Sequence, residues 1–140
     1  RTKIVLYIFD ASFIGALIIP DEYNPHIDKM YNKIRNEDER YVPHLLWYEI
    51  ASIFSNLIRH RRFTNEEVLR FFPRLAAFNL KTDFETGPGY SQKLLRLCND
   101  YHLSSYDASY LELADRKKAA LCTLDKGLRA AAKKYGVMVL

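Results

Sequence analysis

One stretch decides how this sequence folds: the run IVLYIF at residues 4–9, which is followed at once by Asp10. Six consecutive aliphatic, β-branched and aromatic residues are typical of a strand that is buried on both faces of a parallel sheet. Residues 11–17 have the composition of a short helix, which Pro20 terminates. The pattern therefore predicts a buried strand, a carboxylate at its end and a helix immediately after it.

Short apolar strands and amphipathic helices alternate through the rest of the sequence. Residues 41–42 indicate an edge strand, Pro43 fits the first turn of the next helix, and Thr64 and Glu67 have the spacing of a capping box. Strands that alternate with helices predict an α/β fold with a mostly parallel sheet covered on both faces. Helices are expected at residues 26–35, 43–60, 64–78, 91–101, 106–117 and 126–135, and further strands at 120–123 and 137–140.

The composition is that of one globular domain, which we expect to span residues 1–140, because 49% of the residues are hydrophobic and 27% are charged. The excess of 21 Lys and Arg over 17 Asp and Glu favours a polyanionic partner. Cys98 and Cys122 have neither CxxC nor zinc-ligand spacing, so we expect a reducing, cytoplasmic setting. We expect no membrane association, because Asp10 interrupts the apolar residues 4–19, which are fewer than the roughly 20 that span a bilayer.

Acidic residues follow two of the predicted strands. Asp10 and Asp125 would lie at the same edge of the sheet if their strands are neighbours, and ligands bind at that edge in open parallel sheets. Each also precedes a helix, so taken alone each is better explained as an N-cap, and Asp107 suits the first turn of its helix without any catalytic role. Glu49 lies at the border of a buried helical stripe, where a carboxylate must pair with a base, reach water or join other acids around a cation.

The order and sequence context of these acids resemble the PIN-domain ribonucleases, and most closely the toxin subunits of VapBC toxin–antitoxin pairs. The resemblance extends over nearly the whole chain. It rests on Phe-Asp-Ala-Ser at residues 9–12, Val-Pro at 42–43, Trp-Tyr-Glu-Ile-Ala at 47–51, Ser-Tyr-Asp-Ala at 105–108 and Thr-Leu-Asp at 123–125.

The resemblance implies a three-layer α/β/α fold and a metal-dependent endoribonuclease. Metal-activated water would cleave RNA and leave a 5′-phosphate and a 3′-hydroxyl. It also implies that one or two Mg²⁺ (or Mn²⁺) ions bind among four acids, with two hydroxyls that hydrogen-bond within the cluster. The acids would be Asp10, Glu49, Asp107 and Asp125, and the hydroxyls Ser12 and Thr123.

An acidic site needs nearby cations if it is to bind RNA. The candidates follow Glu49 and Asp125 in the sequence, although cations near a helix C-terminus also complement the helix dipole without any ligand. The aromatic residues, among them Trp47 and Tyr48, are assigned to packing rather than to base stacking. The candidate RNA-binding residues are Arg59, Arg61, Arg62, Lys126 and Arg129.

The resemblance also implies partners: a VapB-like antitoxin whose tail crosses the acidic pocket, and a homodimer built on the helices at 43–60 and 64–78. The competing interpretation is a PIN-fold module that binds RNA or protein without cutting, and its mark would be the loss of one or more acids. All four are present. A haloacid-dehalogenase-like phosphatase would need an aspartate where this chain has Ser12.

Overall fold

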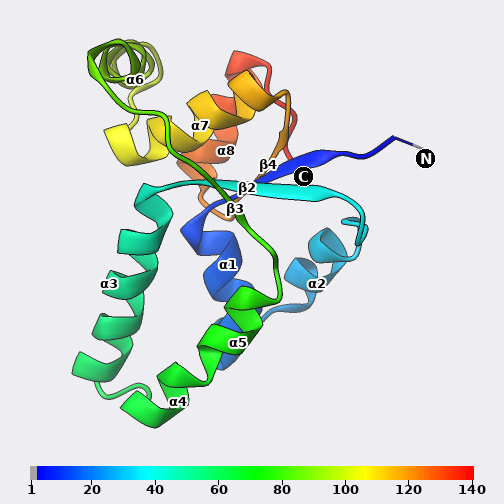
Figure 1. The fold of residues 1–140 in the computed structure, drawn as a ribbon, viewed down its shortest axis with the longest axis vertical. Helices are drawn as coiled ribbons and strands as arrows, with labels where there is room; N and C mark the ends of the chain where they lie inside the picture. Colours follow the sequence, from blue (N-terminus) through cyan, green and yellow to red (C-terminus); the bar gives the residue numbers. More distant parts are fainter. Residues whose placement is uncertain (1–2) are drawn as a thin grey trace.

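A four-stranded sheet lies at the centre of the computed structural model, which describes residues 3–140, so the first two residues of the expected domain lie outside the described range (Figure 1). Neighbouring strands are parallel, in the order β3-β2-β1-β4. The strands are β1 (Leu6–Phe9), β2 (Glu39–Pro43), β3 (Lys81–Asp83) and β4 (Ala120–Cys122).

Helices cover both faces of this sheet, as Figure 1 shows with the sheet seen edge-on. One layer consists of α6 (Pro88–Tyr101), α7 (Ser105–Lys117) and α8 (Lys126–Tyr135). The other side carries α1 (Ala11–Ile18), the short 3₁₀ helix η1 (Pro20–Glu22), α2 (Pro25–Tyr31), α3 (Leu45–Arg59), α4 (Asn65–Leu69) and α5 (Phe71–Ala76). The predicted three-layer α/β/α fold with a parallel sheet is confirmed. Within residues 3–140, no helix has both the length and the apolar character that crossing a bilayer requires.

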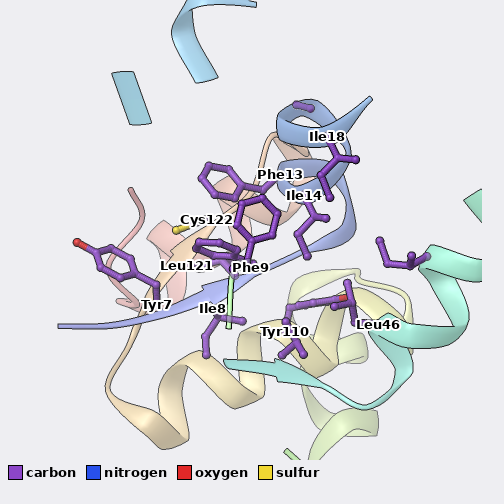
Figure 2. Close-up of a cluster of buried hydrophobic side chains, with 14 of the residues drawn as sticks. Tyr7, Ile8, Phe9, Phe13, Ile14, Ile18, Leu46, Tyr110, Leu121 and Cys122 are labelled. Carbon is purple, nitrogen blue, oxygen red and sulfur yellow. The ribbon is translucent and has the colours of Figure 1, made fainter. Parts of the chain in front are cut away.

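Strand β1 is buried on both faces, as its sequence predicts. Ile8 and Phe9 have no exposed surface, and Figure 2 shows Ile8 on the opposite side of the strand from Tyr7 and Phe9. The Phe9 ring packs edge-on against Phe13, with ring centroids 4.8 Å apart, and against Phe78 at 5.9 Å. The two faces of one short strand thereby join both helical layers to the sheet.

Strand β2 corrects two predictions. It is an interior strand between β3 and β1 rather than an edge strand, because the polar strand β3 pairs with it on the outside. Pro43 ends β2 instead of opening α3, which begins at Leu45. Lys81–Asp83 is not predicted as a strand because it has no apolar run.

The predicted helix at residues 64–78 is also divided. The capping box of Thr64 and Glu67 is present, but α4 ends at Leu69 and α5 begins at Phe71. Pro73 explains the break, because it lacks the N–H that a continuous helix would donate to the carbonyl of Leu69.

The observed bounds of other helices and strands differ from the predicted bounds by a few residues. Helix α2 ends at Tyr31 rather than at residue 35, and α6 begins at Pro88, after Gly87 in a conformation with a φ of 100°. The strand predicted at 137–140 is reduced to a parallel bridge between Val139 and Leu121. Helix α8 has its predicted bounds and ends at Gly136, whose φ is 105°.

Candidate active site

The carboxyl ends of β1 and β4 bring Asp10 and Asp125 to the same edge of the sheet. The two strands are parallel neighbours that pair Phe9 with Cys122, and the Asp10 amide donates to the Cys122 carbonyl over 3.2 Å. The two strands are therefore neighbours in the sheet, which is the condition for Asp10 and Asp125 to share an edge.

Asp10 is almost completely buried and every side-chain oxygen has a donor. Its Oδ1 accepts from the Phe13 amide at 2.9 Å and from the Ser12 hydroxyl at 2.7 Å, and its Oδ2 accepts from the Thr123 hydroxyl. The carboxylate is therefore the N-cap of α1 and also the centre of a polar cluster. The hydrogen bonds expected of Ser12 and Thr123 are present.

The same two hydroxyls connect the β1–α1 junction to the β4–α8 junction. Ser12 Oγ accepts from the Leu124 amide at 3.0 Å, and Thr123 Oγ1 accepts from the Asp125 amide at 3.0 Å. Asp125 then accepts from the Leu128 amide at 2.7 Å and is the N-cap of α8. Both hydroxyls use donor and acceptor functions together, so they fix the positions of both aspartates.

Asp107 enters the site from the first turn of α7. Ser104 is the N-cap of that helix, because its hydroxyl accepts from the Asp107 amide at 3.1 Å. The carboxylate of Asp107 is half-buried and is not needed as a cap. Its position near the other acids is therefore not explained by helix capping.

Glu49 is held by a residue that the sequence did not single out. The Tyr110 hydroxyl donates to Glu49 Oε1 over 2.5 Å, from a side chain that is 2% exposed. Tyr110 lies three residues after Asp107 on α7, so both side chains lie on the same face of that helix. The spacing of three residues between Asp107 and Tyr110 is the sequence signal that could have identified Tyr110 as a site residue.

The four carboxylates form one electrostatic group. Burial is the main cause that raises the pKa of Asp10, Glu49 and Asp107 above their ordinary values. Repulsion adds to it: Asp107 raises the pKa of Asp10, both raise that of Glu49, and Asp125 raises that of Asp107. The acids are therefore close enough together for their charges to disfavour the ionised forms of Asp10, Glu49 and Asp107.

The model of the PIN domain family matches residues 7–134 of this chain. The chain belongs to the PIN domain family. No curated protein matches it. The resemblance drawn from the acidic motifs is thus confirmed at the level of the family.

Solved structures share the fold of this PIN domain over nearly its whole length. PAE2754 from Pyrobaculum aerophilum is 27% identical, with a TM-score of 0.69 over 96% of this chain and 83% of that one. FitAcB from Neisseria gonorrhoeae is 15% identical, with a TM-score of 0.67 over 96% of both chains. VapBC2 from Rickettsia felis, bound to a DNA fragment from its promoter, is 8% identical, with a TM-score of 0.68 over 97% and 98%.

The donor chemistry of this PIN domain fits a hard divalent cation, because all four candidate ligands are carboxylates. Among residues 3–140, none of the four forms an ion pair with a basic side chain, so their repulsion is not neutralised within the protein. In the same range, no three Asp, Glu, His or Cys side chains form a ready-made metal cage. The acids are thus near enough to interact electrostatically, but no three of them surround a common point.

The five candidate RNA-binding cations of the PIN domain lie in different places. Glu49 and Arg59 are ten residues apart on α3, which corresponds to roughly 15 Å along the helix. Arg62 pairs with Asp21 and Glu22, at 2.5 and 3.2 Å. Arg61 follows α3 and lies beside these two arginines at the far end of the helix.

The other two cations belong to α8. The Arg129 guanidinium donates to the carbonyls of Thr123 and Leu140, at 3.3 and 2.9 Å. Lys126 is exposed and directly follows Asp125. Of the five, Lys126 is thus the exposed cation whose position in the sequence adjoins an acid of the cluster.

A hollow of about 370 Å³ is lined in part by Glu49, and the packing predicted for Tyr48 is wrong, because that side chain lies at this hollow. The side chain of Tyr48 is 74% exposed and that of Tyr106 is 63% exposed, and both line this hollow. Tyr48 does not pack in the core because the buried stripe of α3 runs through Leu46 and Ile50, on another face of the helix.

Proposed function

We propose that this PIN domain is a metal-dependent endoribonuclease and the VapC-type toxin subunit of a toxin–antitoxin pair. The observation that carries the proposal is the group of four neighbouring carboxylates: burial and mutual repulsion raise the pKa of Asp10, Glu49 and Asp107, and Asp125 adds to the repulsion on Asp107. Within residues 3–140 none of the four has a basic ion-pair partner. Such repulsion disfavours the metal-free site, and a hard cation with oxygen ligands relieves it. The complete set of acids favours this function over a module that binds RNA without cutting.

Asp10, Glu49, Asp107 and Asp125 would hold one or two Mg²⁺ (or Mn²⁺) ions. Bound metal would lower the pKa of a coordinated water and stabilise the charge that develops on the phosphodiester. Ser12 and Thr123 orient the carboxylate of Asp10. Tyr110 orients Glu49 in the same way.

The RNA substrate would approach from the exposed side of Asp125, where Lys126 can contact a phosphate. A longer strand that follows α3 would reach Arg59 and Arg61. Arg62 and Arg129 are engaged within the protein, so their contribution to RNA binding would be smaller. A net charge of +4 supports binding of a polyanion.

We further propose a VapB-like antitoxin that crosses the acidic pocket and a homodimer built on α3, α4 and α5. The fold of FitAcB and of VapBC2 supports the first partner. The second is supported by an apolar groove of about 570 Å³ between α3 and α4, which the exposed ring of Phe72 borders. The free thiols of Cys98 and Cys122 suit a cytoplasmic setting.

The test is to express the wild type and its Asp107→Asn variant from a tightly controlled promoter and to map new 5′-phosphate ends across cellular RNA. We expect new ends in the wild type alone. Purified wild type should cleave the mapped RNA with Mg²⁺ or Mn²⁺ and stop when EDTA is added. Soluble protein that creates no new ends would favour the non-cutting module.

A further inference from the structure

We propose that Tyr48 and Tyr106 stack on unpaired bases of the RNA next to the bond that is cut, so that the hollow beside Glu49 is a base-binding subsite. This inference rests on the proposed function and extends it. It assigns a substrate-binding role to two residues that lie outside the acidic cluster.

The first argument is position. Tyr48 directly precedes Glu49 on α3, and Tyr106 directly precedes Asp107 on α7. The two rings come from different helices and border the same hollow, together with Ser52 and Ile53. A nucleotide whose phosphate lies at the acids would therefore have a base within reach of this hollow.

The second argument is that both rings are free to receive a partner. Among the aromatic pairs of residues 3–140, neither Tyr48 nor Tyr106 takes part in one, whereas Tyr101 and Tyr135 pack against each other at 5.6 Å. Large rings with most of their surface in water, gathered at one place, mark a binding surface. The volume of the hollow, about 370 Å³, falls in the range of small-ligand sites, roughly 300–1,000 Å³.

The third argument is electrostatic. Among the described residues, no lysine or arginine lines the hollow, and Arg59, Arg61 and Arg62 lie at the other end of α3. Binding energy beside Glu49 must therefore come in part from contacts without charge. Stacking of unpaired bases on tyrosine rings supplies such contacts, and it tolerates any base because each has a π-face.

The experiment uses the Asp107→Asn protein, which should bind RNA without cutting it, and a single-stranded RNA with 2-aminopurine next to the mapped cleavage site. Binding should quench the 2-aminopurine fluorescence as the base stacks. Tyr48→Ala and Tyr106→Ala should abolish most of the quenching and weaken binding by about 5- to 100-fold. Tyr48→Phe and Tyr106→Phe should restore both, because the ring is retained.

Tyr23→Ala is the matched control, since Tyr23 is 57% exposed but does not line the hollow, and it should change neither signal. Quenching that survives both alanine substitutions would overturn the inference, as would alanine and phenylalanine variants that bind equally weakly. RNA affinity that does not change, with a tyrosine-dependent change in oligomeric state, would also overturn it and make the hollow a protein interface. The result is separable from the nuclease proposal, because stacking is measured in a protein that does not cleave.

Discussion

Replacement of Asp10 by asparagine and by alanine separates the two functions of this carboxylate. Asp10 is the N-cap of α1, and burial together with Asp107 raises its pKa. Asparagine is an equally good N-cap, can still accept from the Phe13 amide and removes one repelling charge. The metal-free Asp10→Asn protein should therefore be at least as stable as the wild type at pH 7.

Alanine removes the acceptor as well as the charge. The lost cap costs about 1 kcal/mol. The buried donors left on Phe13 and Thr123 add about 1–3 kcal/mol. For a domain of 140 residues, 1 kcal/mol corresponds to about 3–4 °C in melting temperature, so Asp10→Ala should melt roughly 7–14 °C lower.

The effect of metal on the melting temperature is the second part of the test of Asp10. At a Mg²⁺ or Mn²⁺ concentration about 100 times Kd, binding to the native state adds about 2.7 kcal/mol, or about 9 °C. Differential scanning calorimetry of the wild type should show this rise, and Asp10→Asn should lose most of it. Two results would refute the carboxylate site: a wild-type melting temperature that does not change in millimolar metal, or an Asp10→Asn melting temperature that rises with metal as much as that of the wild type.

The pH dependence of the metal-free protein has a defined sign. Because the pKa of Asp10 is higher in the folded than in the unfolded state, its protonated form favours folding. This contribution is fully present below the unfolded pKa of about 4 and is lost as the pH rises through the folded pKa. The stability of the wild type relative to Asp10→Asn should therefore fall between acidic pH and pH 7 without metal, and denaturant titrations at each pH measure it.

Two further substitutions test other contacts. Tyr110→Phe removes the hydroxyl that lowers the pKa of Glu49, so the acidic limb of the pH–rate profile for RNA cleavage should move to higher pH, with a loss of about 1 kcal/mol in stability. Arg116→Met breaks the contacts of Arg116 with Asp83 at 2.7 Å and Glu112 at 2.9 Å, and urea unfolding at pH 7 should show a loss of about 2–3 kcal/mol. Because Arg116 lowers the pKa of Asp83, the Asp83 part of the loss is present above the unfolded pKa of Asp83 and should disappear as the pH falls through the folded value. A difference between the two proteins that does not shrink as the pH is lowered would contradict this.

Sequence alone predicted the parts of the site that depend on burial patterns. The apolar runs at residues 4–9 and 120–123 identify β1 and β4, and the carboxyl ends of parallel neighbours must share an edge. The sequence therefore predicts that Asp10 and Asp125 share one edge if β1 and β4 are neighbours, and the two strands are paired.

The parts that depend on tertiary contacts were missed. Lys81–Asp83 is polar, and it is a strand because it pairs with β2 and because Arg116 of α7 holds Asp83. The link from Tyr110 to Glu49 joins α7 to α3, so it depends on how two helices lie against each other. Tyr48 is predicted to pack because it lies near the core stripe of its helix, but it is exposed on a face of α3 that differs from that of the buried Leu46 and Ile50.

The capping and cluster interpretations of the acids are compatible. Asp10 and Asp125 are N-caps of α1 and α8, and Asp107 lies in the first turn of α7. The positive end of a helix dipole favours a negative charge at each of these positions. Three of four repelling carboxylates are thus stabilised locally by the helices that carry them, which explains how the metal-free protein can fold with its acids close together. An asparagine at position 10 loses this attraction together with the repulsion, but it keeps an acceptor for the Phe13 amide and so remains an N-cap. A loss of metal binding in a folded Asp10→Asn protein would therefore report on the carboxylate cluster.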